Sequence, residues 1–284
     1  MQDIALIIST TLMYSTPLIF AALGGVFSEN SGIVNIGIEG MMTIGAFAGA
    51  AAGYMLGNPW LAFIIGGLAG GLFALVHALA TVTFNADHTI SGVAINLLAP
   101  GVALFASKIM FDGATMTPTI PMEQKIPRPL NGLFPSGSIL DTIFNAYATV
   151  FIAFILVAVT WYVLYKTKFG LRIRAVGEHP GAADTLGISV AKTRCAAVII
   201  SGILAGLGGA SMSLAVVSSF RPTLISGHGY IAMAAVIFGK WRPQWAMAAC
   251  LLFGFSTALS VYFGNPELPF SINENLLSMI PYIM

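Results

Sequence analysis

Polar side chains interrupt the apolar segments of this chain at a few places, and these side chains are the ones that could do chemistry. Asn35, Glu39, Asn96 and His228 each lie in or at the edge of a segment that is long and apolar enough to span a membrane. Amide, carboxylate and imidazole groups are costly at that depth unless they face protein or a water-filled cavity. We therefore interpret these four residues as candidates for a polar substrate path.

Glu39, in the stretch "NSGIVNIGIEGMM" at 30–42, also has a structural interpretation. Carboxylates are favoured at helix N-termini, where unpaired backbone amides and the helix dipole attract negative charge. The acid could then bond nearby amides where "NIGIEG" opens a helix. His77, His88 and His228 have a similar alternative as packing or interface histidines, and both interpretations stay open at this point.

Several kinds of chemistry are disfavoured by what the sequence lacks. No pair of histidines has zinc-ligand spacing, and no Ser, His and acid grouping indicates hydrolysis. No GxxxxGK[ST] motif for phosphate binding occurs in the chain. We interpret Cys195 and Cys250 as small packing thiols. We expect no metal, no cofactor and no enzymatic activity in this chain, so ATP, if used, must bind to another subunit.

The composition identifies the environment in which these residues act. Of the 284 residues, 57% are hydrophobic and 8% are charged, with a mean hydropathy of +0.88, whereas roughly a quarter of the residues in a soluble domain are charged. The net charge is +1, without the basic surface that nucleic-acid binding requires. We predict an all-α integral membrane protein, a polytopic helical bundle forming one domain over 1–284, with the lipid bilayer and no nucleic acid as its surroundings.

The apolar windows give the number of crossings. A bilayer core of ~30 Å needs about 20 mostly apolar residues per helix. Eight windows approach this length: 4–26, 33–56, 60–82, 89–106, 143–165, 195–217, a short one at 223–239, and 245–263. A last apolar run begins near Leu276, which gives eight to nine helices, some of them interrupted. A backbone cannot end inside hydrocarbon with unsatisfied polar groups. This run therefore either enters the membrane only in part or belongs to a truncated helix, and we expect truncation.

Lys and Arg residues in short loops set the orientation. The loop 166–194 holds six of the twelve basic residues and is predicted to be cytoplasmic, whereas the loop 107–142 is predicted to be external. Within the first loop, "HPGAADTLG" predicts a short helix from Pro180 to a stop at Gly187. Such a helix suits docking on a partner, although a basic loop can instead face anionic lipid headgroups.

Two parts of the sequence resemble each other. "LGG" at 23–25 precedes "GIEGMM" at 37–42, and "LGG" at 207–209 precedes "GHGYIA" at 227–232. Five crossings separate the copies, so they would be inverted relative to each other. Inverted repeats in transporters place substrate sites at their interface, on interrupted helices. Chance similarity between Gly-rich apolar segments is the alternative.

Three stretches together carry a family resemblance: "GIVNIGIEGMMTIGAF" at 32–47, "FGLRIRAVGEHPGAADTLGIS" at 169–189 and "GHGYIAMAAVIFGKWRP" at 227–243. They resemble signature segments of permease subunits in the ribose and branched-chain amino-acid group of bacterial ABC importers, and within it those of nucleoside permeases. Their order and spacing match over most of the chain. His179 departs from the pattern, where a small polar residue such as Asn is more usual.

The resemblance implies a complex in the bacterial cytoplasmic membrane. A second permease chain, here a paralogue, pairs with this one; nucleotide-binding ATPase subunits hold ATP and Mg; and an external substrate-binding lipoprotein delivers a small ligand. The function implied is nucleoside uptake by alternating access. The residues that match the ATPase-coupling element are Phe169, Gly170, Arg172, Arg174, Gly177, Glu178, Ala182, Ala183 and Gly187.

Three other functions stay open on the sequence. The nearest is an ABC importer permease for a pentose or another simple sugar. An ion-coupled secondary transporter would share the buried acid and the inverted repeat but would need no ATPase. A membrane scaffold or receptor would do without transport.

Overall fold

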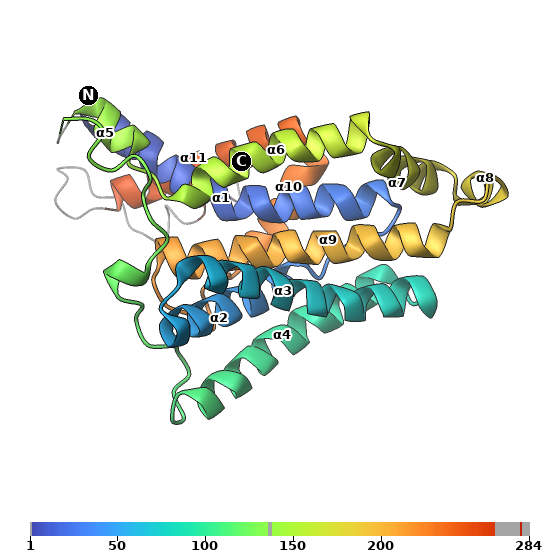
Figure 1. Cartoon of the computed structure of the whole chain (residues 1–284), viewed down its shortest axis with the longest axis horizontal. Coiled ribbons are helices and arrows are strands. Elements are labelled where there is room, and N and C mark those ends of the chain that lie inside the picture. The colour runs from blue at the N-terminus through green and yellow to red at the C-terminus, as the bar shows by residue number, and fades with distance from the viewer. Residues whose placement is uncertain (1, 136–137, 265–278, 280–284) are drawn as a thin grey trace.

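The computed structural model describes residues 2–135, 138–264 and 279, and within these ranges the chain is helical without a strand. Figure 1 shows the helices side by side in one elongated bundle, with α5 near one end and α7 and α8 at the other. We call these the α5 end and the α7 end. The long or apolar helices are α1 (Gln2–Asn30), α2 (Ile38–Leu56), α3 (Pro59–Ala78), α4 (His88–Met110), α6 (Ala148–Lys166), α9 (Val190–Ser211), α10 (His228–Phe238) and α11 (Pro243–Phe263).

These eight helices correspond to the eight predicted windows, and the chain is a multi-pass membrane protein. Six of them are long and apolar enough to span a membrane when the π-helical turns Leu79–Thr83 and Met212–Val216 are counted with α3 and α9. The other two are α2, which begins at an interruption, and α10, which has only 11 residues. The predicted run from Leu276 falls outside the described residues, apart from Met279.

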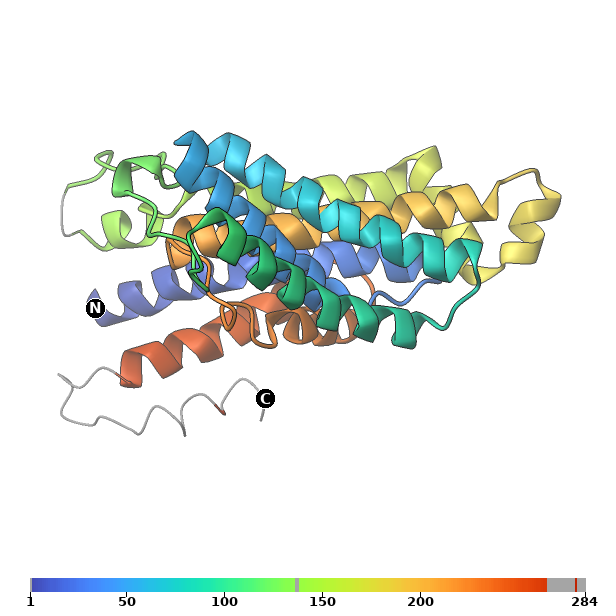
Figure 2. The ribbon, with the colours of Figure 1, turned by 90° about the horizontal axis from the view of Figure 1, so that it is seen from below.

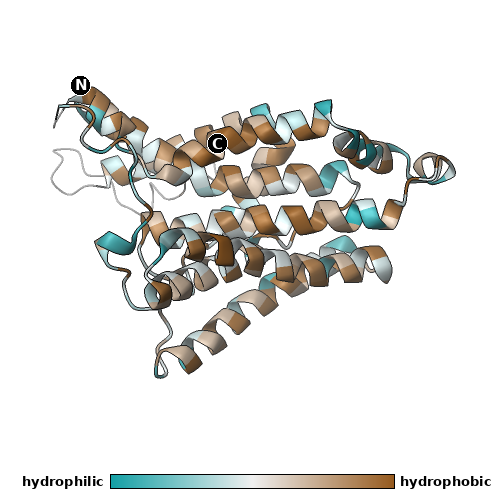
Figure 3. Cartoon of the chain, in the orientation of Figure 1, coloured by the Kyte–Doolittle hydropathy of each residue, from teal (hydrophilic) through white to brown (hydrophobic). Residues whose placement is uncertain are grey.

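The distribution of hydropathy agrees with this assignment. Figure 3 shows hydrophobic residues along the helices and hydrophilic ones gathered on α7 and on the loops at the two ends. Eight of the twelve basic residues lie at the α7 end, namely Lys166, Lys168, Arg172, Arg174, Lys192, Arg194, Lys240 and Arg242. The positive charge of the chain is therefore concentrated at one end of the bundle.

The loop 166–194 is more helical than the sequence suggested. It contains α7 (Lys168–Glu178) as well as the predicted short helix, α8 (Pro180–Thr185). The Thr167 side chain caps α7 by accepting a hydrogen bond from the Gly170 amide at 3.2 Å. Gly170 also lets α7 turn back tightly on α6, since a Cβ there would overlap the Val163 carbonyl.

The loop 107–142, which was predicted to be external, also contains structure that the windows did not separate. Window 143–165 began too early, because α5 (Ile139–Phe144) ends just before the extended residue Tyr147 and α6 begins after it. A 3₁₀ turn, Met122–Gln124, precedes α5. Before this turn, the loop is hydrogen-bonded to the segment that follows α9. The amide of Ile120 in the loop donates to the carbonyl of Ser218 in that segment at 2.8 Å.

Glycines allow α2, α3 and α9 to pack backbone against backbone. A Cβ at Gly45 or Gly70 would overlap α9 backbone atoms, and one at Gly209 would overlap the Met42 carbonyl. Small residues let helices associate closely where lipid offers no hydrophobic drive. These backbone contacts fix the position of α2 against α3 and α9. Figure 2 shows α11 running alongside α1, on another side of the bundle.

Two helix pairs have the same interrupted form in opposite directions. α1 ends at the α7 end, the non-helical segment 31–37 leads back into the bundle, and α2 continues toward the α5 end. α9 runs the other way, the segment 217–227 re-enters from the α5 end, and α10 continues to the α7 end. The window 33–56 therefore began too early, because Gly32 adopts a φ of +84° and residues 33–37 are not helical.

Candidate functional site

The N-termini of α2 and α10 meet inside the bundle, and the carboxylate of Glu39 joins them. Glu39 Oε1 accepts a hydrogen bond from the Gly227 amide, and Oε2 accepts one from the Gly229 amide, both at 2.6 Å. Free amides and the helix dipole at an N-terminus favour an anion. Glu39 thus bonds backbone amides, as its structural interpretation expected, but these belong to α10 and not to its own helix.

Two glycines make this contact possible. Gly227, the N-cap of α10, has a φ of +95°, which side chains rarely tolerate. At Gly229 a Cβ would lie 2.5 Å from Glu39 Cα and 2.6 Å from Glu39 N. The "GHG" stretch therefore permits two helix N-termini to touch along their backbones.

Asn96 extends the junction to α4. Its Oδ1 accepts from the Gly40 amide at 2.8 Å, and its Nδ2 donates to the Ile36 carbonyl and to the Tyr230 hydroxyl, both at 2.9 Å. One amide side chain thereby connects α4, the opening of α2 and the first turn of α10. All of these polar contacts of Asn96 lie where the two interrupted helices meet. We call this region the α2–α10 junction and define it by Glu39, Asn96, Gly227, Gly229 and Tyr230.

Tyr230 is the residue at this junction that the sequence reasoning missed. It follows "GHG" directly, and its side chain is 49% exposed. An aromatic residue next to a Gly-rich helix break was the signal that could have identified it. Its ring and hydroxyl offer a ligand both a stacking face and a polar contact.

The four candidates from the sequence do not all lie together. His228 begins α10, but its ring Nδ1 hydrogen-bonds the Ile225 carbonyl, so the side chain turns back on its own loop. Asn35 is 1% exposed and faces α9, where its Nδ2 donates to Ser201 Oγ at 2.9 Å while its Oδ1 has no partner among the described residues. The junction therefore contains the side chains of Glu39 and Asn96 and the backbone on either side of His228. Asn35 lies outside it, in contact with Ser201 on α9.

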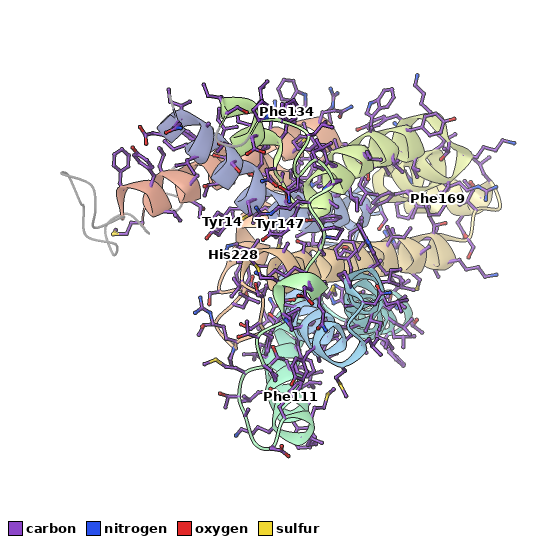
Figure 4. The ribbon with its side chains drawn as sticks, turned by 60° about the vertical axis from the view of Figure 1, so that its left-hand side comes forward. Tyr14, Phe111, Phe134, Tyr147, Phe169 and His228 are labelled. Atoms are coloured by element: carbon purple, nitrogen blue, oxygen red, sulfur yellow. The ribbon has the colours of Figure 1, made fainter. Side chains whose placement is uncertain are left out.

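The predicted coupling residues lie on α7 and α8, away from this junction. Figure 4 shows Phe169 at the α7 end, well apart from His228. Arg172, Glu178, Ala182 and Gly187 are exposed, and Phe169 is 37% exposed. Gly187 has a φ of +77° and open space around its Cα, so it ends α8 without packing on other residues.

The remaining matched positions support the packing of these short helices. Gly170 and Ala183 are buried, Gly177 packs on the carbonyl of Asn30, and Arg174 donates to the Leu164 carbonyl at 3.1 Å. His179 Nδ1 accepts the Ala182 amide at 3.1 Å and so caps α8, which explains how a histidine serves at this turn. At the end of α8, Leu186 is 81% exposed, whereas Ala183 is buried.

In the part of the chain that the structure describes, titratable side chains do not gather into a metal centre. Among the described residues, no group of three or more His, Cys, Asp or Glu side chains is placed to hold a metal ion. Outside the membrane-spanning helices, the Asp87 carboxylate caps α4 by accepting the Ile90 and Thr89 amides, and these bonds lower the pKa of Asp87.

The chain has close relatives among known permeases. It is similar to the guanosine ABC transporter permease protein NupQ of Bacillus subtilis, with 45% identity over 100% of this chain and 90% of NupQ. It is 42% identical to the nucleoside ABC transporter permease protein NupC of Lactococcus lactis subsp. cremoris, over 99% of this chain and 90% of NupC. A second Bacillus subtilis protein, the guanosine ABC transporter permease protein NupP, is 27% identical over 87% of this chain and 72% of NupP.

The family comparison agrees with these relatives. No solved structure matches the chain. The family model described as branched-chain amino acid transport system / permease component matches residues 7–284. With this match covering nearly the whole chain, and with interrupted helices that meet at Glu39, the chain belongs to that family of transport permeases.

Proposed function

We propose that this chain is a permease subunit of an ABC importer that takes up nucleosides. The observation that carries the proposal is the identity of 42–45% with two nucleoside permeases over essentially the full chain. The relatives named as nucleoside and guanosine permeases supply the ligand class. The α2–α10 junction supplies groups that suit such a ligand.

A nucleoside requires polar partners for its ribose and base edges and an apolar or aromatic face for the base. Tyr230, which is half exposed, offers a ring and a hydroxyl, and Asn96 beside it offers an amide. Both carboxylate oxygens of Glu39 already accept backbone amides. We therefore assign Tyr230 and Asn96 to ligand contact and Glu39 to holding the two helix ends in place. Asn35 and His228 remain candidates farther along the path.

The α7 end is proposed to face the cytoplasm of a bacterial cell, where its basic residues satisfy the positive-inside rule. There, α7 and α8 would dock on a nucleotide-binding ATPase that holds ATP and Mg, since this chain carries no phosphate-binding motif. A second permease would complete the path, as suggested by the two guanosine permeases, NupQ and NupP, of one organism. An external binding protein would deliver the ligand at the α5 end, in the bacterial cytoplasmic membrane.

In this mechanism the chain itself does no covalent chemistry. ATP binding and hydrolysis on the partner would press on α7 and α8, and the helices would alternate between outward-open and inward-open arrangements. The α2–α10 junction is suited to this because its two half-helices meet within the bundle and are joined by few hydrogen bonds. Ligand release would follow when the junction and the second permease move apart.

The proposal is tested by reconstituting the chain with its co-expressed ATPase, second permease and binding protein. ATP hydrolysis is then measured across a panel of nucleosides, ribose and other pentoses. We expect stimulation by guanosine or other nucleosides and none by the sugars. A flat response to every nucleoside together with stimulation by a pentose would replace the ligand class with simple sugars.

A further inference from the structure

Helix α10 is held by a carboxylate at each end. At its N-terminus Glu39 accepts the Gly227 and Gly229 amides at 2.6 Å. At its other end the indole N–H of Trp241 donates to Glu29 Oε2, at the last turn of α1. With 11 residues at 1.5 Å each, α10 is a rod of about 16 Å between these two attachments.

The attachment to α1 involves both side chain and backbone. Asn30 Nδ2 donates to the Trp241 carbonyl at 3.2 Å, beside the bond from the Trp241 indole to Glu29. The Trp241 amide in turn donates to the Val236 carbonyl at 3.1 Å and so closes the last turn of α10. Trp241 thus ends α10 and binds it to α1. We call Glu29, Asn30 and Trp241 the clasp.

The backbone at the clasp is held in an unfavourable conformation. Lys240 and Trp241 are consecutive non-glycine residues with φ of +49° and +58°. The left-handed region costs side-chain-bearing residues free energy, and such positions persist where the surroundings determine them and often have a role in function. The hydrogen bonds from Trp241 to Glu29 and from Asn30 to Trp241 hold the backbone in this conformation.

The same end of α1 supports α7. Gly177 of α7 packs so closely on α1 that a Cβ would overlap the Asn30 carbonyl. Arg194, at the start of α9, donates from Nε to the Ser31 carbonyl at 3.2 Å. The turn itself is closed by its own bonds, since the Gly32 amide donates to the Glu29 carbonyl at 3.0 Å. α7, through Gly177, and the segment that ends α10, through Trp241, therefore contact the same compact turn.

We infer that the clasp transmits movement of α7 to α10, and that Glu29 and Trp241 are positioning residues for transport. This inference rests on the proposed function. Displacement of α7 would shift the end of α1, the clasp would move the C-terminus of α10, and the rod would carry Gly227, Gly229 and Tyr230 with it. A connection of rigid elements between two sites becomes evidence for coupling only when its members are tested together.

The test uses the full reconstituted complex and measures the number of guanosine molecules transported per ATP hydrolysed. Glu29→Ala removes the acceptor, and Trp241→Phe removes only the indole N–H and keeps a ring. We expect each variant to keep its ATPase activity and to lose about tenfold in this ratio, as expected for one hydrogen bond to a charged group. The double variant should be no worse than either single variant, because both remove the same contact.

Two controls separate coupling from folding. Glu29→Gln keeps an acceptor oxygen, so its ratio of guanosine transported to ATP hydrolysed should be close to that of the parent. Trp245→Phe changes a tryptophan that is 62% exposed in the first turn of α11, and it should leave the ratio unchanged. If Glu29→Ala yields no intact complex, Trp241→Phe answers the same question with a smaller change.

The outcomes that would overturn the inference are distinct from those that would overturn the proposed function. ATPase activity and transport falling in parallel, additive losses in the double variant, or a ratio equal to that of the parent would each remove the clasp from the coupling route. A parent complex without any nucleoside response would instead overturn the proposed function, before any variant is compared.

Discussion

The carboxylate of Glu39 accepts a 2.6 Å hydrogen bond from the amide of Gly229, which lies 190 residues later in the chain. This bond, with its partner from Gly227, places one acid between the N-termini of two interrupted helices. The relationship explains why an acid is present in such an apolar segment.

Replacing Glu39 should weaken the junction, less for Glu39→Gln than for Glu39→Ala. Glu39→Gln keeps one acceptor oxygen but loses the charge at the N-terminus of α10, whereas Glu39→Ala leaves two amides without a partner. We expect losses of about 1–2 kcal/mol for Gln and more for Ala. The melting temperature of the solubilised complex and nucleoside uptake should fall in that order.

Glu123→Gln is the matched control, because Glu123 is exposed at the α5 end. It should leave both measurements unchanged. A Glu39→Gln variant that melts and transports like the parent would show that the bonds to Gly227 and Gly229 do not hold the junction.

Gly229→Ala should separate the two half-helices. Its Cβ would lie 2.5 Å from Glu39 Cα, and the atom it meets is backbone that cannot swing away. We expect a marked fall in melting temperature and loss of uptake. Gly101→Ala in α4 is the control, since no atom lies within 4 Å of its Cβ position. That change should be neutral or stabilising by roughly 0.5–1 kcal/mol, the helix preference for alanine. Equal effects of the two changes would contradict the close contact at Gly229.

Tyr230 should contribute its ring and its hydroxyl separately to ligand binding. Tyr230→Ala removes a stacking face worth about 1–3 kcal/mol for a base, so the KM for nucleoside uptake should rise by a factor between about 5 and 150. Tyr230→Phe keeps the ring and should have a smaller effect, since Asn96 Nδ2 retains the Ile36 carbonyl. Tyr162→Ala, at an exposed tyrosine of α6, serves as the control. A normal KM for Tyr230→Ala would remove this residue from the substrate path.

Gly187→Leu should disrupt docking of the ATPase. The glycine has a φ of +77° and no neighbour within 4 Å, so leucine would strain the turn and place a bulky group on the exposed end of α8. Gly113→Leu is closely matched, with a φ of +86° and open space, but lies at the α5 end. We expect only the Gly187 variant to lose the co-purified ATPase. Retention of the ATPase by both variants, with normal ligand-stimulated hydrolysis, would contradict the role of α7 and α8.

The sequence predicted the helices well where length and hydropathy decide them. It predicted eight apolar segments, because a run of about 20 apolar residues has few alternatives in a bilayer. The sequence did not predict the helix boundary where a helix is interrupted inside an apolar segment. Ile33, Val34 and Ile36 extend the window of α2 by composition, whereas the turn at Gly32 keeps them out of the helix. It also missed α7, because only Gly170, Ile173 and Val176 are buried along its 11 residues and the basic residues around them suggested a loop.

The site was predicted only in part, for a similar reason. Buried polar residues attract notice in an apolar chain, so Glu39 and Asn96 were identified. Their partners could not be, because the bonds of Glu39 run to backbone amides at Gly227 and Gly229, and amides carry no signature in a sequence. Asn35 was grouped with them because it too is a polar residue in an apolar segment, although its side chain faces Ser201 on α9.

The most direct measurement is uptake of labelled guanosine by proteoliposomes that contain the complete complex. It is made with and without ATP on the side of the ATPase, with ion gradients clamped to zero and then imposed. We predict uptake that requires ATP, the ATPase and the binding protein, and that imposed ion gradients do not replace. Uptake without ATP, driven by an imposed sodium or proton gradient, would contradict the account and identify an ion-coupled transporter instead.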